Sequence, residues 1–168
     1  MPEPIDQPAP RPVQIDTIDE KTFEQGVRFG STYRHLTSAL MGGTYKVGVA
    51  IETLPPGKQS CPFHYHMLEE EHLLMLEGEC TLRLGGDRIT FRAGDYMVFP
   101  AGQKTGHCLI NETTEPCRYI VIGENNPDEV CVYPDSGKVS VSWLGERYDK
   151  RVTMEYFDRE DADKTSDT

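Results

Sequence analysis

The chain has 168 residues and a formal net charge of −11 at pH 7, with 28 acidic and 17 basic residues. This length suits a single domain with a buried core. An acidic chain repels phosphate backbones, which argues against nucleic acid as a partner. No uncharged run is long enough to cross a bilayer, and the start MPEPIDQPAPRP lacks the basic and apolar regions of a secretory signal. We therefore expect a cytoplasmic protein with no membrane partner.

The cysteines do not indicate a disulfide framework or a structural zinc knuckle. Their number is odd and no pair has Cys-x-x-Cys spacing. They are Cys61, Cys80, Cys108, Cys117 and Cys131. Cys61 and Cys108 lie close to histidines in the sequence, so either could lie near a site that those histidines form.

Residues 1–40 are predicted to form an N-terminal arm or extension. Five prolines within the first twelve residues exclude helix and central strand, and favour an extended arm. Residues 16–40 mix acids with spaced apolar side chains, which indicates a short helix or an edge strand against the main fold. His35 is expected at the surface or behind a site rather than as a ligand.

Residues 41–125 have the pattern of a β-barrel core. Residues 44–54 alternate and are rich in β-formers, and Pro55-Pro56-Gly57 ends this strand. The next two strands, 72–76 and 81–84, are predicted to form an extended pair around Glu77-Gly78-Glu79. The remaining strands are predicted at 88–92, 95–99, 107–111 and 118–122. Many short strands with Gly/Pro turns are typical of an all-β sandwich or closed barrel.

Residues 126–168 are predicted to form a C-terminal hairpin and a charged tail. The hairpin joins residues 130–133 to 139–143, and the tail after Asp158 reads REDADKTSDT. Trp143 and the aromatic residues of the tail are expected to pack against the fold or to form dimer contacts.

Two histidines two residues apart, His64 and His66, point to the same face of an extended segment. A metal ion would satisfy both rings in a buried setting. On an unbroken strand Glu71 would point to the face opposite His64 and His66, because it lies five residues beyond His66. The chain must therefore turn or bulge within residues 67–70 to bring Glu71 back to their face. Beyond that point His72 faces outward, and Glu69 and Glu70 are interpreted as loop acids in water.

His107 is the candidate for a third imidazole. It shares a strand face with Leu109 and Asn111, and Asn111 is interpreted as a structural hydrogen-bonding residue. Three nitrogens and one carboxylate suit one divalent transition metal, namely Fe, Mn, Zn, Ni or Co. Such a ligand set leaves one or two positions open for water or substrate.

The two stretches resemble the signature motifs of the cupin superfamily. The first motif is matched by Gly57, His64, His66, Glu71 and Gly78, and the second by Gly94, Pro100, Gly102, His107 and Asn111. The spacing to Gly78 favours Glu71 over its two acidic neighbours. The loop from Gly102 to His107 is two residues longer than in the usual motif.

The resemblance covers about residues 44–123. It implies an all-β cupin double-stranded β-helix, or jelly-roll barrel, with an N-terminal arm and a short C-terminal extension. It implies a metal held by His64, His66, Glu71 and His107, and commonly a homodimer. The chain is similar to single-domain cupins for which sugar-phosphate isomerase activity has been suggested, a similarity that extends to residues 133–138.

This reading predicts a metal-dependent enzyme for a small polar metabolite, with isomerase, lyase or dioxygenase chemistry. An isomerase or lyase needs a general base, which the sequence does not single out. Tyr45, Lys46, Tyr133 and Lys138 are candidates for an acid, a base or an anion anchor. The alternative is a module that binds or senses a metal or small ligand without turnover. An empty structural or storage barrel is disfavoured by four intact ligand positions.

Overall fold

A computed structural model describes residues 11–43 and 45–160. Residues 1–10 of the predicted arm, Thr44 of the first predicted strand and residues 161–168 of the predicted tail lie outside the described residues. Within the described part, none of the helices has the length and apolar character that a membrane span requires.

One side of the molecule is a six-stranded antiparallel sheet with the order β1-β2-β3-β10-β5-β8. Apolar side chains alternate with polar ones along these strands, as in a sheet that buries one of its faces. Their bounds are Lys21–Gln25 (β1), Phe29–His35 (β2), Val47–Leu54 (β3), Cys117–Glu124 (β10), Glu71–Glu77 (β5) and Tyr96–Phe99 (β8).

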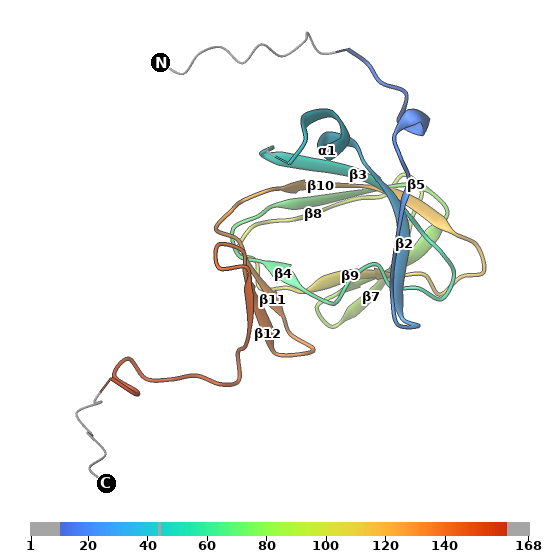
Figure 1. The fold of residues 1–168 in the computed structure, drawn as a ribbon. Coiled ribbons are helices and arrows are strands. Elements are labelled where there is room, and N and C mark those ends of the chain that lie inside the picture. The colour runs from blue at the N-terminus through green and yellow to red at the C-terminus, as the bar shows by residue number, and fades with distance from the viewer. Residues whose placement is uncertain (1–10, 44, 161–168) are drawn as a thin grey trace, which may run out of the picture.

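The opposite side is built from two smaller sheets, with the orders β7-β6-β9 and β13-β12-β11-β4. The first comprises Asp87–Arg92 (β7), Glu79–Leu84 (β6) and His107–Ile110 (β9); the second comprises Glu146–Asp149 (β13), Lys138–Val141 (β12), Val130–Tyr133 (β11) and Tyr65–His66 (β4). A bridge between His64 and His107 joins the two. Figure 1 shows these strands facing β3, β10, β5 and β8 across the barrel. The predicted all-β jelly-roll barrel is confirmed.

The N-terminal region contains both of the elements predicted as alternatives for it. β1 and β2 form a hairpin at the edge of the large sheet, and β2 pairs with β3. A short helix, Leu36–Met41 (α1), follows β2, and a 3-10 turn, Ile15–Thr17, precedes β1. His35 caps α1, because its Nδ1 accepts a hydrogen bond from the Ser38 N–H at 3.1 Å.

The predicted pairing of residues 72–76 with 81–84 is wrong. The two segments are strands β5 and β6, but β5 pairs with β10 and β8, whereas β6 pairs with β7 and β9. Gly78 lies at the corner between them with φ +73°, and a Cβ there would lie 2.8 Å from the carbonyl oxygen of Pro116. The close approach turns the chain from one side of the barrel to the other instead of into a hairpin.

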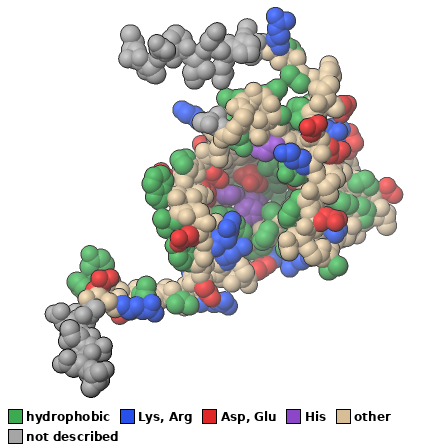
Figure 2. All heavy atoms as spheres, viewed as in Figure 1, with side chains coloured by type: hydrophobic (Ala, Val, Ile, Leu, Met, Phe, Trp, Pro, Cys, Tyr) green, Lys and Arg blue, Asp and Glu red, His purple; other side chains and the backbone are tan. Residues whose placement is uncertain are grey.

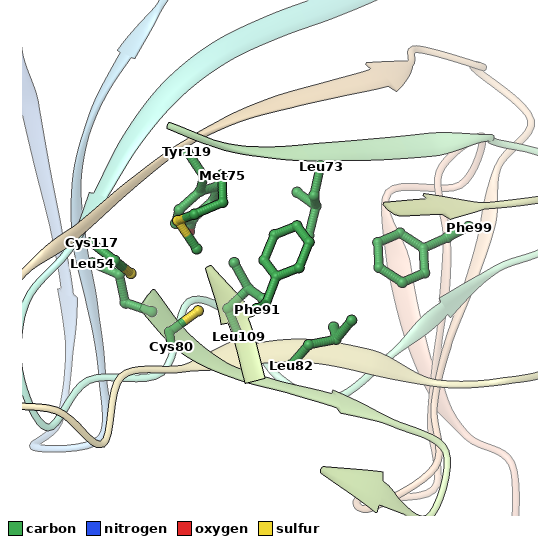
Figure 3. Packing of buried hydrophobic residues seen from close by; sticks show 10 residues of the cluster. All are labelled: Leu54, Leu73, Met75, Cys80, Leu82, Phe91, Phe99, Leu109, Cys117 and Tyr119. Atoms are coloured by element: carbon green, nitrogen blue, oxygen red, sulfur yellow. The ribbon is translucent and has the colours of Figure 1, made fainter. Parts of the chain in front are cut away.

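The hydrophobic core lies between the two sides of the barrel (Figure 3). Its ten residues are nearly all inaccessible to solvent and come from strands of both sides. They are Leu54, Leu73, Met75, Cys80, Leu82, Phe91, Phe99, Leu109, Cys117 and Tyr119. All five cysteines are free thiols, and four of them are buried.

Candidate metal centre

The structure brings the four predicted ligands together inside the barrel. His64 precedes β4, His66 ends β4, Glu71 begins β5 and His107 begins β9. One ligand atom from each residue lies within 4.8 Å of the ligand atoms of the others. The Nε2 atom of His66 is 3.5 Å from one carboxylate oxygen of Glu71, and the Nε2 atom of His107 is 3.4 Å from the other.

The Nε2 atoms of His64 and His66 lie 3.1 Å apart. Nδ1 of His64 donates to the Pro62 carbonyl at 2.8 Å, and Nδ1 of His66 donates to the Glu129 carboxylate at 3.2 Å. Both protons of the neutral rings are therefore on Nδ1, so two Nε2 lone pairs face each other. This arrangement requires a proton or a metal ion between the two rings.

His107 supplies a second sign of a missing partner. Its side chain is about 3 % exposed, and neither of its ring nitrogens forms a hydrogen bond. Among the described residues, these are the only buried side-chain nitrogens or oxygens without a hydrogen-bonding partner. Phe99 stacks on the ring at 3.7 Å and 10°, which fixes its orientation. Because burying an unpaired polar group is costly, the ring fits a metal ligand better than a core histidine.

The electrostatics of the cluster favour a cation. Burial alone would raise the pKa of Glu71, but its contacts with His107 and His66 outweigh burial and hold the pKa well below its usual range. Burial, together with the neighbouring His107, lowers the pKa of His64 to about 4. For His66, burial lowers the pKa, but Glu71 and then Glu129 and Glu69 raise it above the ordinary value. At neutral pH the cluster thus offers an ionised carboxylate and a neutral His64.

Sequence reasoning missed Glu129, which lies in the loop before β11. Its carboxylate accepts hydrogen bonds from the backbone N–H groups of Met67, Leu68 and Glu69 at 3.0, 2.8 and 2.9 Å. The residue is 3 % exposed and also holds Nδ1 of His66. Glu129 therefore holds the chain between β4 and β5 in a turn. The turn that the position of Glu71 predicted within residues 67–70 is confirmed. No local sequence pattern marks an acid in a loop as the partner of a segment sixty residues away.

The acids beside Glu71 differ from each other. Glu69 was expected in water, which is wrong: its side chain is 17 % exposed, and it accepts the backbone N–H of Asn126 at 2.7 Å. Glu69 also lies 3.5 Å from Nδ1 of His66, opposite Glu129. Glu70 is half exposed and contacts His72. The outward orientation of His72 is confirmed, since its ring bonds to Tyr96 and Glu70 on the outer face of β5.

Asn111 has the structural role predicted for it. It is fully buried, and its amide nitrogen donates to the carbonyl groups of Leu54 and Glu115, both at 2.8 Å. Its oxygen accepts hydrogen bonds from Thr113. These bonds tie the end of β9 to the end of β3, away from the cluster.

The predicted acid–base candidates divide into two groups. Tyr133 stacks on His64 with ring centroids 5.9 Å apart, and the ammonium of Lys138 lies 4.0 Å above the Tyr133 ring. Tyr133 therefore packs against the ring of His64, and Lys138 packs on Tyr133. Tyr45 receives a hydrogen bond from Nε2 of His35 at 3.0 Å, and with Lys46 it lines a surface groove beside α1.

A cavity of about 180 Å³ opens onto the cluster. Its walls include His64, Glu71 and His107 together with Cys61 and Cys108, so both cysteines near the histidines lie at the site. Two further lining residues that the sequence did not indicate are Glu52 and Tyr119. Figure 2 shows the hollow from outside, with histidine and acidic side chains visible in its depth.

A family model described as a cupin domain matches residues 50–123, the part of the chain that carries all four residues of the cluster. Residues 50–123 form a cupin domain. A search of curated proteins found no match to this cupin.

Two solved cupin structures resemble the chain over nearly its whole length. A protein named as a putative sugar phosphate isomerase, from Acidithiobacillus ferrooxidans, is 26% identical with a TM-score of 0.74, over 84% of this chain and 93% of that one. A sugar phosphate isomerase from a cupin superfamily, from Silicibacter pomeroyi, is 27% identical with a TM-score of 0.73, over 88% and 98% of the two chains. A predicted oxalate decarboxylase from Thermotoga maritima is 22% identical with a TM-score of 0.58, over 69% of this chain and 100% of that one. This third likeness shows the fold alone.

Proposed function

We propose that this cupin is a divalent-metal-dependent enzyme that isomerises a small hydroxy-carbonyl metabolite of the sugar-phosphate class. The observation that carries the proposal is the convergence of three imidazoles and one ionised carboxylate on a single point, with two Nε2 lone pairs only 3.1 Å apart. The two structures that are 26% and 27% identical bear names of this activity and support the choice of reaction.

The ligand set fits one divalent transition metal of the group Fe, Mn, Zn, Ni and Co. His64, His66 and His107 would supply nitrogen and Glu71 oxygen, and Glu129 would hold the ring of His66 in place. When bound, such an ion polarises a carbonyl oxygen and stabilises negative charge on it. The chain itself contributes a buried cavity with apolar walls such as Leu73 and Leu109, which limits the access of water.

Isomerase, lyase and dioxygenase chemistry make different demands on this site. An isomerase needs a group that removes a proton and returns it to the neighbouring carbon. A dioxygenase needs a redox-active metal with two adjacent open positions. The named neighbours favour the first, and the non-catalytic alternative predicts metal and ligand binding with no exchange of substrate protons.

The first experiment measures the metal in protein purified without a metal-binding tag, using elemental mass spectrometry. We expect about one metal ion per chain in the wild type and in His72→Ala, because that ring faces outward next to Glu71. Glu71→Gln and His107→Ala should lose most of it. Equal metal content in all four proteins would refute the ligand assignment.

The second experiment incubates the metal-loaded protein in D₂O with ribose 5-phosphate, fructose 6-phosphate and dihydroxyacetone phosphate. Proton NMR then follows loss of the C–H signal next to the carbonyl group. Exchange that depends on the metal supports an isomerase. Binding of a probe without exchange supports the sensing or binding module instead.

We also propose that the chain forms a homodimer through its C-terminal segment. This segment extends away from the barrel in Figure 1 and carries apolar side chains that are more than half exposed. They are Trp143, Leu144, Val152, Met154, Tyr156 and Phe157. A second copy would cover them. Light scattering during gel filtration should give a dimer for the wild type and a monomer for a Trp143→Ser/Tyr156→Ser/Phe157→Ser variant; a wild-type monomer would contradict the proposal.

A further inference from the structure

Glu52 is a partly buried acid that does not belong to the metal cluster. It lies on β3, and its carboxylate accepts a hydrogen bond from the hydroxyl of Tyr119, its direct neighbour on β10, at 2.9 Å. Both residues line the cavity that His64, Glu71 and His107 also line.

Glu52 lines two neighbouring cavities, which we call the inner and the outer lobe. The inner lobe, about 180 Å³, contains the cluster; the outer lobe, about 210 Å³, reaches His35 and Tyr45 near the rim. Glu52 and Val121 line both lobes and therefore mark the junction between them. Ligand pockets usually measure about 300–1,000 Å³, which is more than the inner lobe alone offers, so we expect a sugar phosphate to occupy both lobes. A molecule that binds at the cluster and extends outward must then pass Glu52.

Two glycines keep the outer lobe open. Gly48 and Gly123 are paired across β3 and β10, and Glu71 is the partner of Gly123 on β5. Both glycines line the outer lobe, and a Cβ on Gly123 would meet no atom within 4 Å. A larger side chain at position 123 would fill the space through which the ligand extends.

We propose that Glu52, positioned by Tyr119, is the group that transfers the proton of the molecule bound at the cluster. The inference rests on the proposed function. In the forward step, the ionised carboxylate takes a proton from the carbon next to the substrate carbonyl. The electron pair of that C–H bond forms the new C=C bond, and the carbonyl π pair moves to oxygen. The proton of the neighbouring hydroxyl group moves to the oxyanion, and the oxygen that lost it forms the new C=O bond. The C=C electron pair then takes the proton from Glu52 at the former carbonyl carbon, so no hydrogen is gained or lost and the reaction needs no oxidant or reductant.

The surroundings of Glu52 raise its pKa above the ordinary glutamate value. Burial raises its pKa, hydrogen bonds from Tyr119 and from Ser31 on β2 lower it, and the charge of Glu71 on β5 raises it again, for a net increase. Other titratable groups line the same space: Cys61, His64, His107 and Cys108 in the inner lobe, and His35, Tyr45 and Glu124 in the outer lobe. Burial raises the pKa of the Cys61 thiol well above its ordinary value. A carboxyl group with a raised pKa accepts and returns a proton more readily than an ordinary glutamate does.

Glu52→Gln is the decisive variant, and the exposed Glu79→Gln is its matched control. We expect wild-type metal content in both, and a loss of C–H exchange of about 100-fold or more in Glu52→Gln only, since general acid–base groups contribute factors of about 10²–10⁴. Glu52→Asp should restore part of the exchange. Exchange within threefold of wild type in Glu52→Gln would overturn the inference.

Gly123→Val tests the path of the ligand. It should weaken binding of dihydroxyacetone phosphate, measured as a several-fold rise in KM, with unchanged metal content and little change in kcat. Unchanged KM would contradict a ligand that spans both lobes.

A titration separates this inference from the proposed function. Carbon-13 NMR of protein labelled at the glutamate carboxyl carbons should show one resonance, missing in Glu52→Gln, that titrates above the usual glutamate range. In Tyr119→Phe this pKa should rise further, because the ionised form loses a hydrogen bond. If the wild type exchanges no probe, the proposed isomerase fails. The role of Glu52 is overturned independently if its pKa is ordinary.

Discussion

Replacing Glu129 by glutamine should loosen the turn that carries Glu71 to the metal cluster. One carboxylate oxygen accepts from Met67 N–H and His66 Nδ1, and the other from Leu68 N–H and Glu69 N–H. Whichever oxygen becomes the amide NH₂, two buried donors lose their acceptor. At about 1–3 kcal/mol for each of the two unsatisfied donors, the free energy of unfolding should fall by about 2–6 kcal/mol. This is a large part of a typical stability of about 5–15 kcal/mol.

Urea unfolding of the metal-free protein measures this change. With a slope of about 2 kcal/mol per molar urea, the midpoint should fall by about 1–3 M. Competition with a chromophoric chelator should show Zn²⁺ affinity about 10–100-fold weaker, because Glu129 orients the ring of His66. Glu124→Gln is the matched control, since Glu124 accepts a single exposed backbone N–H, that of Glu70 at 3.0 Å. If Glu129→Gln matches this control in both measurements, Glu129 does not organise the turn.

Three further changes test the site and the fold. His107→Leu should abolish metal binding yet raise the stability of the metal-free protein by about 1 kcal/mol, because two unpaired buried nitrogens disappear; a less stable metal-free variant in urea would contradict this. Adding a strong chelator to the metal-loaded wild type should lower Tm by about 5–10 °C in calorimetry, since metal at 100-fold over its Kd contributes about 2.7 kcal/mol; an unchanged Tm would mean that no metal stabilises the fold. Gly78→Ala should cost about 2–4 kcal/mol, because it combines positive φ with a backbone contact at 2.8 Å. Gly57→Ala, with φ +75° and open space, should cost only about 1 kcal/mol, and equal losses in urea unfolding would refute the role of the contact.

The sequence predicted the site better than the strand pairing. Strand parity alone put His64 and His66 on one face, sent His72 outward and required a turn before Glu71, and each of these is found in the structure. The reason is that side-chain direction along a strand is a local property with period two. The motif resemblance added which glutamate and which second stretch to combine.

The features that the sequence did not predict all depend on residues far apart in the chain. The pairing of β5 with β10, rather than with β6, follows from closure of the barrel and not from the turn at Gly78. Glu129 binds a turn sixty residues earlier, and Glu52 meets Tyr119 across β3 and β10. An isolated acid in a loop or strand has the same local pattern whether it faces water or a cavity, so only tertiary structure distinguishes them.

The inward faces of the barrel strands change from apolar to polar along their length. On β5, Met75 and Leu73 lie at the apolar end and Glu71 at the polar end. On β9, Leu109 lies at the apolar end and the cluster residue His107 at the polar end. β3 runs from buried Leu54 to Glu52, so three strands place core residues at one end of the barrel and ionisable residues at the other. The apolar end contains the packing that stabilises the fold, whereas the polar end cannot pack closely without a bound ion or ligand. A substitution of a metal-ligating residue that abolishes metal binding, but leaves the urea midpoint of the metal-free protein unchanged, would therefore affect the site and not the fold.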